Sequence, residues 1–253
     1  MYPIALEIGN LTIRWYGVMA ACGFLIASWL LDRNRDYAKL SKDQCGTMLI
    51  IALVAGILGA RIFYVVQFFD QYRNDLIRIF FIHEGGLVFY GGFILAFLSI
   101  IVYTRKNHLD TIRVLDIFAP AMAAAHGFGR IGCFLNGCCF GRATDSFWGV
   151  TAPEGTLLFL QTKGLPVHPV QLLEAGENFL LCILYCWLLK KGKRGTVVSA
   201  YLIIYGILRC INETLRGDNV LYWNLTPAQW IGILLIPVGA GLLYYFIRHE
   251  KRA

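Results

Sequence analysis

The sequence predicts an all-α integral membrane protein with about seven transmembrane helices. Of its 253 residues, 57% are hydrophobic and 15% are charged, whereas a soluble domain is typically about half apolar and about a quarter charged. Several apolar runs approach the roughly 20 residues that a helix needs to cross a bilayer. These runs also lack the two-residue alternation of membrane β-barrel strands, so helices are the expected spanning elements.

Seven apolar runs are predicted to cross the membrane. In chain order they are Tyr16–Leu31, Thr47–Val66, Gly86–Tyr103, Val114–Phe128, Gln171–Leu189, Thr196–Glu213 and Gln229–Ile247. The fourth is the weakest because it is short and contains Asp116 and Pro120. The sequence has no internal repeat and no low-complexity segment, so residues 1–253 are expected to form one membrane-embedded domain.

The distribution of basic residues predicts the orientation of the spans. The net charge is +7, but the lysines and arginines fall in short clusters between the apolar runs. They do not form the single patch that nucleic-acid binding requires. Loops on one side carry fourteen of the 23 basic residues, and loops on the other side carry seven. Because cytoplasmic loops are enriched in lysine and arginine, the N-terminus is expected outside and the C-terminus inside.

The longest connection between predicted spans lies on the outer side, over residues 131–170. Connections of this length usually carry function or are disordered. Its aromatic residues Phe147, Trp148 and Phe159 suit a layer that lies on the membrane interface. We therefore expect a small outward-facing cap.

Charged residues inside the apolar runs point to function, because an arginine at the centre of a membrane helix costs about 3 kcal/mol. The first candidates are Arg61, Arg130, Arg209 and Glu213, and Glu174 and Glu177 rank second. Tyr205, Arg209 and Glu213 recur every four residues and therefore share one helix face. Either Arg209 and Glu213 form an ion pair that only neutralises itself, or Glu213 orients Arg209 toward an anion.

Arg130 begins the glycine-rich turn "RIGCFLNGCCFGR", and Gly129 and Gly132 flank it. Glycines there let a ligand approach the backbone closely, and arginine binds phosphate through paired hydrogen bonds and charge. The alternative is an arginine that snorkels from the end of a span. Arginines gathered near the outer leaflet favour a phospholipid headgroup as the anion. They favour a lipid-modifying enzyme over a channel, which would need a ring of like residues.

Two further stretches carry candidate site residues. The segment Gly85–Gly92 has a glycine pair at each end and Tyr90 between them. Its glycines indicate either close helix packing or a tyrosine hydroxyl held near a reacting centre. His168 and Pro169 precede the fifth span, and Glu174 lies near its start. A proline at that position is also a common helix-start signal.

Three cysteines, Cys133, Cys138 and Cys139, crowd into the glycine-rich turn. They are candidates for nucleophiles, for a disulfide on an oxidising side of the membrane, or for metal ligands. No histidine or acidic partner stands at ligand spacing, so no metal site is expected. The expected role is to fill the tight turn.

Six motifs, taken in chain order, resemble the bacterial phosphatidylglycerol–prolipoprotein diacylglyceryl transferase family over nearly the whole chain. They are "IRWYG" (Ile13–Gly17), "GARIFYV" (Gly59–Val65), "GGLVFYGG" (Gly85–Gly92), "GRIGCFLNG" with a following "FG", "HPVQLLE" (His168–Glu174) and "YGILRCINETLR" (Tyr205–Arg216). Each motif is moderately specific, and the ordered set is strongly so.

The resemblance implies the first step of lipoprotein maturation in the bacterial cytoplasmic (inner) membrane, with the active site toward the outer, periplasmic side. The diacylglyceryl group of phosphatidylglycerol moves to the thiol of a lipobox cysteine in a prolipoprotein signal peptide. A thioether forms and glycerol phosphate leaves. No metal and no soluble cofactor are implied.

Residue roles follow from the matched positions and from the pattern of charges. The expected catalytic residues are Arg130, Arg209, Glu213, Tyr90 and Tyr16. The expected phosphatidylglycerol-binding residues are Arg130, Arg209, Asn136, Gly141, Arg61, Glu174 and His168. Arginines suit the negative charge that develops on a departing phosphate, and the acceptor thiol must lose its proton to attack.

The sequence departs from the family pattern at three places. Tyr90 occupies a position where many members carry a histidine, and tyrosine is a poor base at neutral pH. Cys133 and Cys138 replace an asparagine and a glutamate of the signature, and Gly232 stands where a serine is expected. The alternatives are therefore a paralogous phospholipid-headgroup transferase and a non-catalytic lipid-binding membrane protein. Acceptor proteins, acyl-chain preference, general base, oligomeric state and cysteine redox state stay open.

Overall fold

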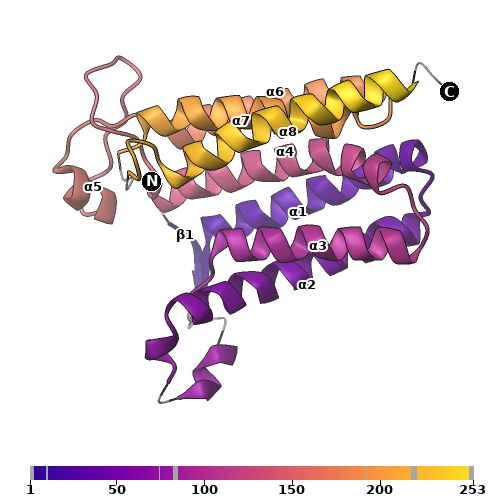
Figure 1. The fold of residues 1–253 in the computed structure, drawn as a ribbon. Coiled ribbons are helices and arrows are strands. Elements are labelled where there is room, and N and C mark those ends of the chain that lie inside the picture. Colours follow the sequence, from indigo (N-terminus) through magenta and orange to yellow (C-terminus); the bar gives the residue numbers. More distant parts are fainter. Residues whose placement is uncertain are drawn as a thin grey trace. The chain divides into compact units, whose positions relative to one another are not determined.

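The computed structural model describes residues 3–9, 11–73, 75–81, 85–191, 193–217 and 221–250. The chain divides into two compact units (Figure 1). The first unit combines Met1–Tyr37 with Leu115–Ala253, and the second unit is Ala38–Val114. Each unit is treated separately below.

Helices make up most of the described chain. Six of them are long and apolar enough to cross a membrane: α1 (Trp15–Asn34), α2 (Lys42–Gln67), α3 (Phe89–Lys106), α6 (Val170–Leu189), α7 (Thr196–Leu215) and α8 (Pro227–Glu250). The predicted fourth span lies in α4 (Thr111–Asn136), which has 26 residues but is not among these six. The all-α membrane fold is confirmed, while the count of seven spans and their orientation stay predictions.

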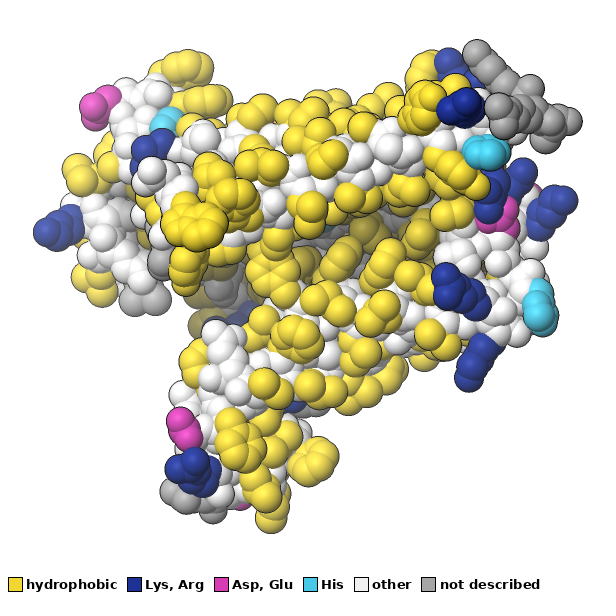
Figure 2. Space-filling model, viewed as in Figure 1, with side chains coloured by type: hydrophobic (Ala, Val, Ile, Leu, Met, Phe, Trp, Pro, Cys, Tyr) yellow, Lys and Arg dark blue, Asp and Glu magenta, His cyan; other side chains and the backbone are white. Residues whose placement is uncertain are grey.

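Large apolar side chains cover the outer surfaces of these helices. Leu25, Val66, Leu180 and Leu234, from four different helices, are between 66% and 73% exposed. Figure 2 shows hydrophobic side chains along the lengths of the helices and many of the lysines and arginines near helix ends. A water-soluble protein rarely exposes such continuous apolar surface, so these faces are suited to contact lipid acyl chains.

The first unit begins with a short hairpin that the sequence analysis did not anticipate. Strand β1 (Ile4–Ile8) pairs antiparallel with β2 (Leu11–Arg14), with Ile8 opposite Leu11 and Ile4 opposite Arg14. Gly9 has φ +57° at the turn. Such a conformation favours glycine, because a side chain there would meet the backbone. Helix α1 follows directly from β2.

The carboxylate of Asp116, inside the apolar run of α4, is stabilised by hydrogen bonds to other parts of the chain. It is completely buried. Its oxygens accept hydrogen bonds from the Gly195 amide at 2.6 Å, the Val198 amide at 2.8 Å and the Tyr37 hydroxyl at 2.9 Å. Gly195 is the N-cap of α7 and has no side chain to satisfy the free amides of that helix start. Asp116 therefore caps α7 from a neighbouring helix.

Helices α7 and α8 pack closely through two glycines. A Cβ atom built on Gly232 would lie 2.8 Å from the Gly206 carbonyl oxygen and 2.9 Å from the Cys210 sulfur. A Cβ on Gly206 would lie 2.6 Å from the Gly232 carbonyl oxygen. Small residues allow this backbone contact between membrane helices. The serine expected at position 232 would therefore require the two helices to move apart.

The second unit is built on the pair α2 and α3. A capping box formed by Ser41 and Gln44 starts α2. Farther along, Gly59 faces Gly91, and a Cβ on Gly59 would clash with the Gly91 carbonyl oxygen. A Cβ on Gly92 would lie 2.7 Å from the carbonyl oxygen of Gly56. The glycine pair after Tyr90 therefore serves close helix packing, as one of the two interpretations predicted.

Four short helices complete the described elements. They are η1 (Arg35–Ala38), η2 (Phe69–Gln71), η3 (Leu76–Phe80) and α5 (Leu157–Thr162). Helix α5 lies within the predicted cap. Its N-cap is Thr156, whose hydroxyl accepts a hydrogen bond from the Phe159 amide at 3.2 Å, and its C-cap is Lys163 with φ 54°. The cap segment is thus locally ordered between α4 and α6.

Candidate functional site

Four charged side chains from α4, α6 and α7 form one buried network in the first unit. Arg130 Nε lies 2.6 Å from Glu174 Oε2, and Arg209 Nη1 lies 3.7 Å from Glu174 Oε1. Arg209 Nη2 lies 3.0 Å from Glu213 Oε2. Glu174 therefore connects two arginines that stand far apart in the sequence.

The helices that carry the network fix its geometry. Arg209 and Glu213 are one turn apart on α7, which confirms that they share a face. Pro169 is the N-cap of α6 and places Glu174 in the first turns of that helix. Arg130 lies near the C-terminal end of α4, and its Nε also donates to His126 Nε2 at 3.2 Å. Three helix ends thus deliver the charges to one place.

The charges of the network alternate and balance. The arginine side chains are 13% and 15% exposed, and the two glutamate side chains are 5% and 3% exposed. In a low-dielectric interior an unpaired arginine would be costly, and a carboxylate beside each guanidinium offsets that cost. The arginines keep the larger exposed fractions, so an incoming anion would meet positive charge first.

The loop after α4 is tied to the start of α6. The Gly141 amide donates to the His168 carbonyl oxygen at 2.9 Å, and Gln171 Nε2 donates to the Cys138 carbonyl oxygen at 2.7 Å. A Cβ on Gly141 would lie 2.6 Å from the His168 Cβ. The close approach requires glycine at this position. Two residues predicted to bind lipid, Gly141 and His168, therefore lie side by side.

The same loop is also joined to the end of α7. The Arg142 amide donates to the Leu215 carbonyl oxygen at 2.8 Å, and Gly141 forms an isolated antiparallel bridge with Arg216. Arg216 is the C-cap residue of α7. These contacts hold the glycine-rich turn against both helices that supply carboxylates to the network.

Tyr16 and Asn136 lie at two other edges of the glycine-rich segment. A Cβ on Gly132 would lie 3.1 Å from Tyr16 Cδ2, so α1 and α4 touch there. The Tyr16 side chain is large, and 48% of its residue surface is exposed. Asn136 is the last residue of α4, and Gly137 follows it with φ 73°. The structure thus brings Tyr16 next to the signature segment.

Arg61 belongs to the second unit and has different partners. It is 5% exposed, and its guanidinium donates to backbone carbonyl oxygens of the loop that follows α2. The acceptors are Arg78, Ile79 and Gly85 at 2.7 Å each, Gly86 at 3.2 Å and Phe81 at 3.4 Å. Its contacts make it a clamp for that loop, and its predicted role in lipid binding stays a prediction.

Tyr90, the other candidate in the second unit, lies in the first turn of α3. It is 46% exposed, and its ring meets Phe89 edge to face at a centroid distance of 5.9 Å. An exposed hydroxyl in this position is available to an outside group. Its predicted catalytic role stays a prediction.

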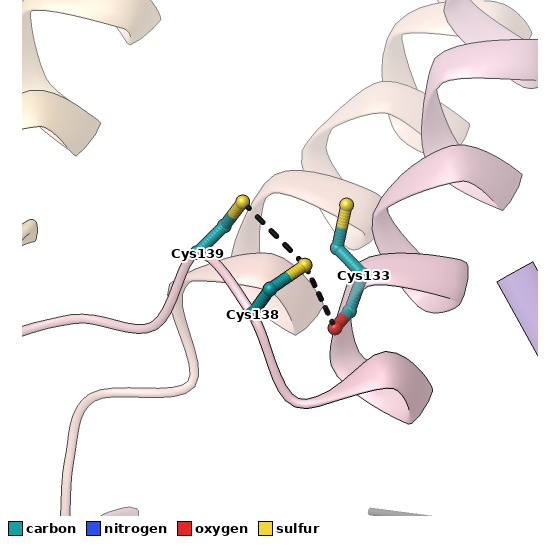
Figure 3. Close-up of side chains that lie close together, drawn as sticks. All are labelled: Cys133, Cys138 and Cys139. Carbon is teal, nitrogen blue, oxygen red and sulfur yellow. Dashed lines mark hydrogen bonds between the residues drawn. The ribbon is translucent and has the colours of Figure 1, made fainter. Parts of the chain in front are cut away.

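Cys133, Cys138 and Cys139 bring their sulfur atoms together at the end of α4 (Figure 3). The three Sγ atoms all lie within 4.8 Å of one another, and those of Cys138 and Cys139 are 3.7 Å apart. Cys139 has φ 61°, which turns its side chain back toward the other two. The neighbouring thiols of Cys133 and Cys138, and then the charges of Arg216 and Arg130, lower the pKa of the Cys139 thiol.

Two polar contacts near the network escaped the sequence analysis. His126 accepts a hydrogen bond from Arg130, and helical spacing could have indicated this contact because the two residues are four apart on one helix. Asn212 Nδ2 donates to Glu177 Oε2 at 2.6 Å. Their helices meet only in the folded chain, so the sequence carried no sign of this pair.

An apolar pocket of about 270 Å³ opens between the predicted cap, the start of α6 and the end of α7. Its walls include Trp148 from the cap, His168 and Pro169 from the segment before α6, and Leu215 from α7. The Trp148 ring meets the His168 ring edge to face, with centroids 5.9 Å apart. The pocket offers apolar surface next to residues that the sequence predicted to bind lipid.

Comparison with known proteins decides the family. A model of the family described as prolipoprotein diacylglyceryl transferase matches residues 3–245. The chain belongs to the prolipoprotein diacylglyceryl transferase family. The match spans both compact units and all four residues of the charged network.

Relatives of the transferase family match along the whole chain. A protein from Clostridium botulinum strain Langeland is 34% identical over 253 residues, covering 100% of both chains. One from Clostridium tetani is 35% identical over 245 residues, or 94% of this chain and 95% of the relative. One from Streptococcus pneumoniae strain JJA is 31% identical over 254 residues, covering 99% and 95%. All three are named phosphatidylglycerol–prolipoprotein diacylglyceryl transferase.

Proposed function

We propose that this multi-pass membrane protein transfers the diacylglyceryl group of phosphatidylglycerol to a cysteine thiol of prolipoproteins. The observation that carries the proposal is the buried network Arg130–Glu174–Arg209–Glu213 in a chain that matches the family from end to end. Two arginines held by carboxylates at helix ends suit a phosphate that must be bound and then released with added charge.

Binding of phosphatidylglycerol would change the partners of the arginines. One phosphodiester carries a single negative charge, and Arg130 and Arg209 would meet it with guanidinium N–H groups while Glu174 and Glu213 hold their orientation. Gly141 and His168, which are hydrogen-bonded to each other before α6, and Asn136 at the end of α4 would line the headgroup. The apolar pocket next to His168 would take apolar parts of a substrate.

The reaction exchanges one bond for another. The acceptor thiol loses its proton, and its sulfur forms a bond to the terminal glyceryl carbon. The bond between that carbon and the phosphate oxygen breaks, and its electron pair leaves on glycerol phosphate. Arg130 and Arg209 stabilise the negative charge that develops on the leaving phosphate. Tyr16, next to the signature segment, is a candidate side chain for contact with the reacting groups, and the catalytic role of Tyr90 stays a separate prediction for the second unit.

The proposed setting is the bacterial cytoplasmic membrane, with the site toward the outer side. The excess of lysine and arginine in the opposite loops supports this orientation. The acceptor would be the lipobox cysteine of a signal peptide. Residues 131–170 would form a cap over a single membrane-embedded domain and would place Trp148 at the pocket wall.

The direct test uses the purified full-length protein in detergent with phosphatidylglycerol and a lipobox peptide. The expected result is release of glycerol phosphate together with a peptide mass gain of one diacylglyceryl unit. Arg130→Ala and Arg209→Ala should abolish both signals while the proteins still insert and purify normally. Arg248→Ala is the matched control, because that exposed arginine of α8 contacts only Tyr244 among the contacts described.

Two other outcomes would favour the alternatives. Lipid binding without glycerol phosphate release would support a non-catalytic lipid-binding protein. Lipid turnover with an acceptor other than the lipobox thiol would support a different headgroup transferase. Full activity in both arginine variants would contradict the proposed roles of Arg130 and Arg209.

A further inference from the structure

Cys133, Cys138 and Cys139 form a cluster, called the cysteine cluster below, at the end of α4 and in the loop that follows. Cys133 comes from the last turns of α4, and the other two come from the loop that follows. All three are free thiols and half-buried, and their sulfurs gather on one side of the loop (Figure 3). The three sulfurs are close enough together for one bound ion to reach all of them.

The spacing of the sulfurs fits a metal ion. With Zn–S bonds of about 2.3 Å, two sulfurs lie about 3.8 Å apart in a tetrahedral site and about 4.0 Å apart in a trigonal one. The Sγ atoms of Cys138 and Cys139 are 3.7 Å apart. The whole set lies within 4.8 Å, so the widest pair needs to close by about 1 Å at most to bind one ion.

The surrounding charges favour a thiolate-rich complex. Three thiolates and one Zn²⁺ carry a net charge of −1, which the half-buried surroundings would have to compensate. Arg130 lies one turn before Cys133 on α4, and Arg216 borders the loop through its bridge with Gly141. Arg216 is therefore the positive side chain next to the loop that would offset this charge, since the charge of Arg130 is already paired with Glu174.

We propose that Cys133, Cys138 and Cys139 form a three-thiolate site for a thiophilic metal ion of the Zn²⁺ class. The sequence argument against a metal was the lack of histidine or acidic partners at ligand spacing, and three sulfurs together remove that objection. The ion would join the end of α4 to the loop that Gln171 anchors to α6. It would thereby stabilise the turn that follows Arg130. A fourth coordination position would be left to a ligand from outside the trio.

The test measures metal content directly. The full-length protein is purified in detergent under reducing conditions, stripped with a chelator, incubated with Zn²⁺ and desalted. Elemental analysis is expected to give one Zn²⁺ per wild-type chain and none in the triple variant Cys133→Ser, Cys138→Ser, Cys139→Ser. The matched control is Cys182→Ser with Cys186→Ser, which removes two cysteines of α6 and should keep the ion.

A second measurement uses a single variant, because the triple variant could lose the metal simply by failing to fold. Cd²⁺ bound by thiolates absorbs in the ultraviolet, in proportion to the number of Cd–S bonds. The single variant Cys139→Ser is expected to lose about one third of the wild-type absorbance per bound ion, because one of three sulfurs is gone. The control pair should show the full wild-type band.

Three results would overturn the proposal. One is a reduced wild-type protein that binds neither Zn²⁺ nor Cd²⁺. Another is an unchanged metal content in the triple variant. The third is a disulfide within the cluster, found by peptide mass mapping of protein purified without reductant, that persists in the active state.

Discussion

The two compact units each bury arginine, and the partners of these arginines differ. Arg61 in the second unit donates to five backbone carbonyl oxygens. Arg130 and Arg209 in the first unit are paired with carboxylates. Carbonyl groups are neutral and fixed by the chain, whereas a carboxylate is a charged group that an incoming anion can partly replace. The comparison separates an arginine that holds the fold from arginines suited to bind a substrate.

The largest expected effect concerns Arg130. Arg130→Gln keeps a side chain of similar length and polarity but removes the charge next to Glu174. We expect the transfer rate to fall about 100- to 1,000-fold, the scale for loss of one group that stabilises developing charge. Initial rates of glycerol phosphate release measure it, at equal amounts of folded protein. A rate within threefold of wild type would contradict the proposal that Arg130 acts on the substrate.

Arg61→Ala should affect stability far more than chemistry. Five carbonyl oxygens lose their donor, and we expect a loss of about 3 kcal/mol in the free energy of unfolding after partial rehydration. Thermal unfolding in detergent reports the loss, and the rate per folded molecule should stay within about threefold. If instead the KM for phosphatidylglycerol rises while thermal stability is unchanged, Arg61 binds lipid as the sequence suggested.

Asp116 tests whether the role of a buried charged residue depends on its hydrogen-bond partners or on the unit in which it lies. It lies in the first unit, as the network does, but its partners are two backbone amides and a tyrosine hydroxyl. We expect Asp116→Asn to lower the free energy of unfolding by about 2 kcal/mol, because an amide group accepts these hydrogen bonds poorly. Activity per folded molecule should not change. Asp36→Asn, at a 93% exposed side chain, is the control and should be neutral.

The smallest expected effect is the coupling within the network. Glu174 contacts Arg130 directly, so Arg130→Gln and Glu174→Gln should not act independently on the transfer rate. We expect the double variant to retain about tenfold more activity than the product of the single effects predicts, a coupling of about 1.4 kcal/mol. A double-mutant cycle on initial rates measures it. Strict additivity would mean that the 2.6 Å contact does not serve the reaction.

Some of the site could be predicted from the sequence because it depends on local geometry. Arg209 and Glu213 are four apart on an apolar helix, and helical periodicity alone places them together. Arg130 could be proposed as a phosphate-binding residue because it lies at the end of a predicted span and in a glycine-rich turn. The buried position of Asp116 was visible as an anomaly, but its partners at the start of α7 were not.

By itself the sequence determined the membrane class, the apolar helices, the family motifs and the helix face that carries Arg209. These features follow from composition and from periodicities of a few residues. Only the tertiary structure decided that Glu174 joins Arg130 to Arg209, that Arg61 clamps its own loop, and that three sulfurs converge after α4. Such contacts join residues on different elements or across an irregular turn. They depend on how helices pack and where the chain adopts a positive φ, which local patterns do not encode.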